Sequence, residues 1–133
     1  MTKTFKAQIE DFKNKSVRDM LYVATASIQD VMEGAMTPQL GVTKGASGFE
    51  EGKIPVAEAD LINSLTTNGI IGAESYVTVI SGMKLGDTIR FAWTAEHALP
   101  MEVGTSTIEG RHYVGKNAAK FPQFVGQRSR EVR

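Results

Sequence analysis

Residues 16–35, which read SVRDMLYVATASIQDVMEGA, contain the strongest helical pattern of the chain. Apolar side chains recur there at spacings of three and four, which places them along one side of an α-helix. Ser16 is the expected N-cap, with Asp19 three positions on as an imperfect capping-box partner. Gly34 and Pro38 bracket the expected end of the helix. Its apolar positions are Val17, Met20, Leu21, Ala24, Ile28, Val31, Met32 and Ala35.

The segments on either side of this helix are less regular. Phe5, Ile9 and Phe12 also have helical spacing, but residues 14–15 predict a break, so the N-terminus is either a separate short helix or an irregular lead-in. After the helix, residues 37–57 are rich in glycine and have no clean period. A loop of this length in a compact domain is usually functional or a disordered insertion, and both alternatives stay open.

The middle of the chain predicts a short helix followed by a β-hairpin. Residues 57–65 have helical spacing, and Asn68-Gly69 marks the end of this helix. Residues 76–80 are mostly β-branched or aromatic, which favours a strand, and residues 88–93 alternate along a second strand. These two strands alone are marginal, so the hairpin must pack on the long helix or pair with further strands.

The last third predicts two helices separated by a loop. Residues 95–103 have helical spacing, with Leu99 on the apolar side that packs inward. Residues 104–120 are read as a loop or an extended arm. Residues 122–132 form a closing helix that Phe124 helps to anchor.

These elements predict an α+β fold in a single domain of residues 1–133. A long N-terminal helix packs on a small antiparallel sheet, with long loops at 37–57 and 104–120 and a short C-terminal helix. Residues 121–133 form a basic C-terminal tail. A chain of 133 residues is long enough to bury one hydrophobic core.

The composition limits the classes of function. Fifteen basic and fifteen acidic residues cancel, so long-range attraction to DNA or to an anionic membrane is not favoured overall. The chain has no cysteine, which excludes disulfides, thiol nucleophiles and cysteine-bound zinc. No apolar run approaches the roughly 18 residues of a membrane span, and the N-terminus lacks a signal-peptide core. We therefore expect a chain that is made in the cytoplasm and has no membrane partner.

Patterns typical of catalysis or cofactor binding are not found in the sequence. The two histidines, His97 and His112, lack the spacing of a paired metal site. The glycines match neither a P-loop nor a dinucleotide fingerprint, and there is no nucleophile elbow. We expect no enzymatic activity, no catalytic residues, no metal and no cofactor, so that function depends on assembly.

The end of the chain is basic. From residue 111 to residue 133, six residues are basic and only Glu131 is acidic, which gives a net charge of +5. Such a segment faces DNA or an acidic neighbour, or it forms an ordinary solvated surface, and both alternatives stay open. The candidate channel-facing or partner-facing residues are Arg111, Lys116, Lys120, Arg128, Arg130 and Arg133.

Several short motifs occur together in one order. Residues 96–104, EHALPMEVG, follow Ile54-Pro55-Val56 and the segment LINSL at residues 61–65. With the long helix before them and a late phenylalanine after them, these motifs resemble the tail-completion, or neck, proteins of long-tailed bacteriophages. The chain departs from the family at residues 57–60, where Thr-Gly is expected, and at His97, where Tyr is common. The matching positions are Pro55, Val56, Leu61, Ser64, Glu102, Gly104, Thr105 and Phe124.

The resemblance implies a virion structural protein at the head–tail junction. It implies assembly as a homo-oligomeric ring, of roughly six or twelve copies, around the channel through which the genome passes. The implied partners are further copies of the chain, the head connector or adaptor, the tail terminator or tail tube, and genomic DNA contacted without sequence preference. Residues 37–57 and 105–120 are the expected contacts between adjacent copies.

Three other functions remain open. The first is a tail terminator that caps the tail tube, which shares the size and fold class of a neck protein. The second, from a different class, is a small regulatory module that binds nucleic acid through the basic C-terminal residues. The third is a small enzyme, although the sequence offers no catalytic constellation.

Overall fold

A computed structural model of the chain describes residues 4–39, 51–55, 60–96, 98–106 and 110–132. It has the α+β fold that the sequence predicts, with a long N-terminal helix, a small three-stranded antiparallel sheet and a short C-terminal helix. The elements are α1 (Phe5–Ala35), β1 (Pro38–Gln39), β2 (Ile54–Pro55), α2 (Asp60–Asn63), β3 (Leu65–Thr67), β4 (Ile70–Ile71), α3 (Ser75–Ser81), β5 (Phe91–Trp93), α4 (Ala98–Val103), α5 (Gly115–Ala118) and α6 (Phe121–Glu131).

Helix α1 begins eleven residues earlier than the expected start at Ser16, because no break occurs at residues 14–15. Its N-cap is Thr4, whose hydroxyl oxygen accepts a hydrogen bond from the backbone N–H of Ala7 at 3.1 Å. At the position where the break was expected, the side chain of Lys15 forms an ion pair of 2.6 Å with Asp19 of the next turn. The helix is 31 residues long, which corresponds to about 46 Å at 1.5 Å per residue.

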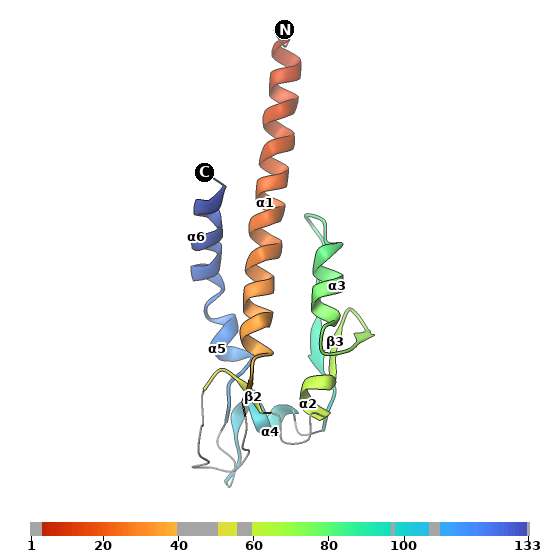
Figure 1. Cartoon of the computed structure of the whole chain (residues 1–133), viewed down its shortest axis with the longest axis vertical. Coiled ribbons are helices and arrows are strands. Elements are labelled where there is room, and N and C mark those ends of the chain that lie inside the picture. The colour runs from red at the N-terminus through yellow and green to blue at the C-terminus, as the bar shows by residue number, and fades with distance from the viewer. Residues whose placement is uncertain (1–3, 40–50, 56–59, 97, 107–109, 133) are drawn as a thin grey trace.

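The other elements gather around the C-terminal half of α1. In Figure 1, α6 lies along one side of this helix and α3 along the other, and the N-terminal half of α1 extends beyond both. The core is at the opposite end of the molecule, where an edge-to-face contact joins the rings of Trp93 and Tyr113 at 5.3 Å between centroids. The buried core residues are Met32, Met36, Ile54, Leu61, Leu65, Met101 and Tyr113.

The sheet differs from the expected hairpin. Residues 76–80, expected as a strand, belong to helix α3, so β5 pairs with β3 instead. Helix α3 contacts both α1 and β3, and its Ser75 hydroxyl lies 2.8 Å from the hydroxyl of Thr67 in β3. This packing outweighs the strand propensity of the β-branched residues.

Asn68-Gly69 does not end a helix, as was expected, but forms the turn between β3 and β4. Both residues have positive φ, 52° for Asn68 and 84° for Gly69. An Asn-Gly pair is favoured in a two-residue hairpin turn because such turns need positive φ. The side chain of Asn68 also accepts a hydrogen bond from the N–H of Arg90 at 2.8 Å, which ties this turn to the segment that precedes β5.

Two segments expected as loops are partly regular. The described ends of residues 37–57 form β1 and β2, which pair in parallel, and residues 40–50 and 56–57 lie outside the described residues. In the region 104–120, the backbone of Arg111 donates to the carbonyl of Met101 at 2.7 Å, and α5 follows. Residues 110–115 are therefore packed on α4 and do not form an extended arm.

The expected closing helix is present as α6, and it is docked along α1. Residues 121–131 of the expected basic tail therefore belong to the folded body. Gly34 of α1 lies close to α5 just below this contact, because a Cβ at position 34 would come within 2.1 Å of the Asn117 side-chain oxygen.

We predict that Gly34→Ala destabilises the fold, by about 1–3 kcal/mol, because the added methyl group must displace Asn117. Asn117 itself donates to the carbonyls of Gly52 and Tyr113 at 2.7 Å each, so this displacement also strains buried hydrogen bonds. The matched control is Gly126→Ala in α6, where a Cβ meets nothing closer than 4.0 Å. It should stabilise the helix by up to about 1 kcal/mol. Urea unfolding of both variants checks the pair, and equal effects would contradict the close approach.

Candidate assembly surface

The exposed half of α1 carries three large apolar side chains on one side. Phe5 is 78% exposed, Ile9 52% and Phe12 74%. Their spacings of four and three residues place them in one row along the helix. We call Phe5, Ile9 and Phe12 the apolar stripe. A contiguous exposed patch of this kind is typical of a surface that contacts another molecule.

The row of the apolar stripe continues down α1 onto the part that α5 and α6 cover. Steps of three and four residues lead from Phe12 through residues 16, 20, 23 and 27 to Asp30 and Gly34. Asp30 is bound to Arg128 of α6, and Gly34 lies against Asn117 of α5. The apolar stripe is therefore the uncovered continuation of a face whose lower half is already packed.

A small groove lies between α1 and α6 on the packed half of this face. Its volume is about 360 Å³ and its walls are mostly apolar. We call it the α1–α6 groove, and its lining includes Met20, Val23, Ala24, Phe121, Val125 and Val132. Between this groove and the apolar stripe, the row passes the polar residue Ser16.

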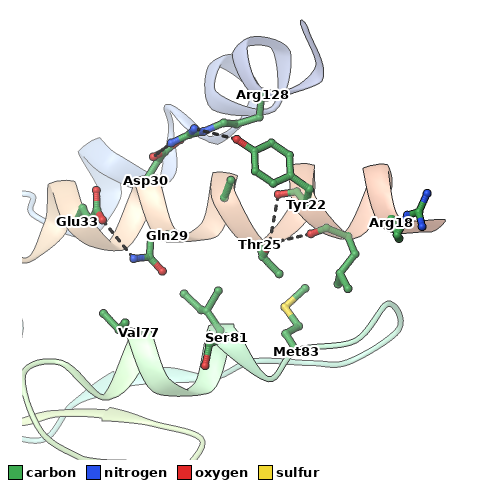
Figure 2. A pocket seen from close by; sticks show the side chains of 13 residues that line it. Arg18, Tyr22, Thr25, Gln29, Asp30, Glu33, Val77, Ser81, Met83 and Arg128 are labelled. Atoms are coloured by element: carbon green, nitrogen blue, oxygen red, sulfur yellow. Dashed lines mark hydrogen bonds and ion pairs between the residues drawn. The ribbon is translucent and has the colours of Figure 1, made fainter. Parts of the chain in front are cut away.

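A charged cluster holds α6 against α1 (Figure 2). The guanidinium of Arg128 donates to both carboxylate oxygens of Asp30, at 2.9 Å from Nε and 2.7 Å from Nη2. Its Nη1 also donates to Tyr22 at 3.3 Å and to Glu131 at 3.2 Å. Two-point binding of a carboxylate by arginine fixes the relative position of the two helices.

The same cluster shifts the pKa values of three of its members. The Tyr22 hydroxyl donates to Glu131, and this hydrogen bond is the largest cause that raises the pKa of Tyr22 and lowers the pKa of Glu131. Hydrogen bonding to Asp30 is the main reason that the pKa of Arg128 is raised. Tyr22 is thus held neutral, while Glu131 and Arg128 are held charged.

A second groove lies along α1 toward α3, and Arg128 of α6 and its partner Asp30 also line it (Figure 2). Its volume is about 620 Å³, and along α1 its lining extends from Arg18 to Glu33. We call it the α1–α3 groove. Its apolar lining residues are Leu21, Ala26, Val77, Ile80 and Met83.

Exposed apolar side chains also occur at the opposite end of the molecule. In α4, Met101 is buried, but Leu99 is 68% exposed and Val103 is 58% exposed. The expectation that Leu99 packs inward is therefore wrong. Ile70 and Ile71 of the edge strand β4 are exposed as well.

The positions that carry the family resemblance mostly hold the body together. Leu61 is in the core, and the hydroxyl of Ser64 donates to the Leu61 carbonyl at 2.7 Å. The carboxylate of Glu102 accepts from the N–H groups of Val114 and Gly115, at 3.0 and 2.8 Å, and so caps α5. Gly104 follows α4 with φ of 88°.

Four further motif positions have simpler surroundings. Pro55 lies in β2, and Thr105 is exposed. Phe124 is half-buried in α6, and Val56 lies outside the described residues.

The six candidate basic residues do not form one surface. Arg111 is completely buried, so the expectation that it faces a channel or partner is wrong. Arg128 is bound to Asp30 within the molecule. The Nζ atom of Lys116 lies 3.7 Å from Oε1 of Glu51. Lys120 and Arg130 are exposed. Arg133 lies outside the described residues.

The described residues contain no cluster of side chains suited to hold a metal ion. His112 is exposed, and His97 is outside the described part of the chain. None of the described helices has the length and hydropathy to cross a membrane.

No protein-family model, curated protein or solved structure matches this chain. The resemblance to neck proteins therefore remains an interpretation of the residue pattern.

The sequence contained a signal for one part of this surface. The spacing of Phe5, Ile9 and Phe12 predicts a helical face, but not whether another element covers it. The Asp30–Arg128 pair joins residues 98 positions apart, and no local pattern predicts such a contact.

We predict that Leu99→Asp changes monomer stability by no more than about 0.5 kcal/mol, as expected for an exposed site. Met101→Asp, two residues away on the buried side of the same helix, should cost about 3 kcal/mol or more because it buries a charge. Thermal unfolding of the two variants measures the difference. A large loss for Leu99→Asp would mean that Leu99 is part of the core.

We also predict that the docking of α6 weakens at both acidic and alkaline pH. The pKa of Glu131 is lowered in the folded protein. Its contribution to the docking of α6 is therefore present above the usual pKa of glutamate and is lost as pH falls through the folded pKa. Tyr22 has a raised pKa, so its contribution is present below its usual value near 10 and is lost as pH rises through the folded pKa.

Tyr22→Phe should remove the weakening of α6 docking that ionisation of Tyr22 causes at alkaline pH. It should also reduce the weakening of α6 docking at acidic pH, because Glu131 no longer accepts a hydrogen bond from Tyr22. Hydrogen exchange of α6 amides across pH, compared with the unchanged protein, measures both effects. The comparison cancels the alkaline contributions of Tyr76 and Tyr113, whose pKa values are raised by burial. Superimposable profiles would show that the Tyr22–Glu131 bond does not hold α6.

Proposed function

We propose that this chain is a virion structural protein of the head–tail junction, which assembles as a ring around the DNA channel and joins the head connector to the tail. The observation that carries the proposal is the apolar stripe on the uncovered half of α1. The order of short motifs that resembles the neck proteins supports the same proposal independently.

The energetics of the stripe favour assembly through repeated contacts. Burying a phenylalanine or isoleucine side chain contributes about 1.5–3 kcal/mol, so three of them supply roughly 4–9 kcal/mol. Association costs about 4–15 kcal/mol in lost freedom of motion. One such contact is therefore marginal in isolation. A closed ring gives every copy two contacts and makes the last one intramolecular, which favours assembly.

The distribution of apolar surface suits a protein with neighbours on several sides. The stripe lies at the N-terminal end of α1, while Leu99, Val103 and the two isoleucines of β4 are exposed near the other end. Because these two surfaces differ, each suits a different neighbour. The stripe is available for contact between copies, and the other end is available for the head connector or the tail.

Weak contact with DNA is compatible with a channel through which the genome moves. The net charge of the chain is zero, and Arg111 and Arg128 are engaged inside the fold. Each phosphate contact adds a salt-dependent term to binding, so a small set of basic residues holds DNA loosely. This also reduces the support for a regulatory module that grips nucleic acid through its C-terminal residues.

We predict that Phe5→Ser combined with Phe12→Ser leaves the monomer folded, because both side chains are exposed, but prevents incorporation into particles. The matched control, Glu10→Ser, alters the same helix outside the stripe. Circular dichroism checks the fold, and immunolabelling with cryo-electron microscopy of intact particles checks the position. Particles with the normal amount of the double variant at the neck would refute the role of the stripe.

The same particle maps test the function itself. Density for this chain at the junction of head and tail supports a neck protein. Density at the end of the tail tube, formed before heads attach, would instead identify a tail terminator. Absence of the chain from purified particles would overturn the proposal.

A further inference from the structure

We infer that the apolar stripe of one copy docks in the α1–α3 groove of the next copy. This inference rests on the proposed ring and identifies the two surfaces that meet in it. The occupant of the groove is therefore the N-terminal half of α1 from a second copy of this chain.

Symmetry supplies the first step of the argument. A cyclic ring with more than two copies contains only heterologous contacts, in which one surface meets a different surface on the next copy. The apolar stripe cannot pair with itself in such a ring. Its mate must be another surface of the same chain.

The position of the α1–α3 groove fits this requirement. The stripe continues the row of α1 that α6 covers. The groove is lined mainly by another row, which includes Arg18, Thr25 and Gln29. It reaches the α6 side at Asp30 and Arg128. These two rows are offset by two residues along the helix, which places them on different sides of it. Figure 1 shows α6 and α3 on opposite sides of α1. A stripe on one side and a groove on the other let identical copies follow one another.

The dimensions are compatible with this contact. From Phe5 to Phe12, the apolar stripe spans about 10 Å at 1.5 Å per residue. Along α1, the groove lining from Arg18 to Glu33 spans about 22 Å. The groove is therefore long enough to take the whole stripe.

The chemistry of the groove suits an apolar helix. Its apolar lining includes Leu21, Ile80 and Met83, and methionine adapts readily to an incoming aromatic ring. Its charged lining residues balance, because Arg18 and Arg128 are matched by Asp30 and Glu33. The contact with the stripe is therefore one of apolar burial, and not of opposite charges.

The stripe supplies part of the area that a repeated interface needs. A phenylalanine side chain that becomes fully buried removes roughly 150–250 Å² from solvent. Because Phe5 is 78% exposed, Phe12 74% and Ile9 52%, the three side chains together provide up to about half of the roughly 800 Å² per partner that a standard interface buries. Neighbouring contacts at the body of each copy supply the remainder.

The test uses single cysteines, because the chain contains none. Ile9→Cys places a thiol on the stripe, and Ser81→Cys places one on the rim of the groove. The two variants are purified separately and treated with a short bis-maleimide, alone and after mixing at concentrations that form rings. The same treatment is applied to purified particles that carry both variants. Glu10→Cys mixed with Ser81→Cys is the matched control.

Cross-linked dimers should appear only when Ile9→Cys and Ser81→Cys are combined, and should be lost with Glu10→Cys. Cross-linking of Ile9→Cys to itself would overturn the inference, because it would show that stripes pair with each other. Rings that give no cross-link between the two positions would also overturn it, and would leave the proposed function standing. A chain that stays monomeric and is missing from particles would overturn both.

Discussion

The length of α1 relative to everything that packs on it is the constraint on which the rest of the structure depends. The helix is 31 residues long, while α6 has 11 residues and α3 has seven. Both shorter helices lie along its C-terminal half (Figure 1). The apolar side chains of Phe5, Ile9 and Phe12, beyond the reach of both, are therefore exposed. A helix this long is stable in water chiefly where packing supports it, so the exposed half gains most from a second molecule.

The covered half of α1 is held by unlike contacts on its two sides. Helix α6 is fixed by a charged cluster around Arg128 whose members are partly exposed, and exposed ion pairs contribute little each. Helix α3 is fixed through the buried Ile80 and the Thr67–Ser75 contact to the sheet. Helix α6 nevertheless makes the more extensive contact with α1 of the two. Its C-terminal end lies beside Asp19 and Met20, so the stripe from Phe5 to Phe12 lies beyond it.

The sequence predicted those elements whose residues carry a local period. The lower part of α1, the closing helix and the helix at α4 were predicted because their apolar residues repeat at helical spacing. Residues 76–80 were predicted wrongly, because β-branched residues favour strands until packing on α1 and β3 decides otherwise. Asn68-Gly69 carried a usable hairpin signal that was read as a helix end. The exposure of Leu99 and the burial of Arg111 depend on tertiary contacts, so no local pattern predicts them.

The resemblance to neck proteins and the apolar stripe are separate arguments, because they concern different parts of the molecule. Leu61, Ser64, Glu102 and Gly104 act within the body, where they fill the core, cap α5 or follow α4. None of these residues lies on α1. A shared body can carry different functions, so motif positions alone support a fold more strongly than a role. The stripe supports association through exposed surface area, which does not depend on the resemblance. The proposal of a ring-forming neck protein is strongest where these two arguments agree, namely that a small α+β body presents a long helix to its neighbours.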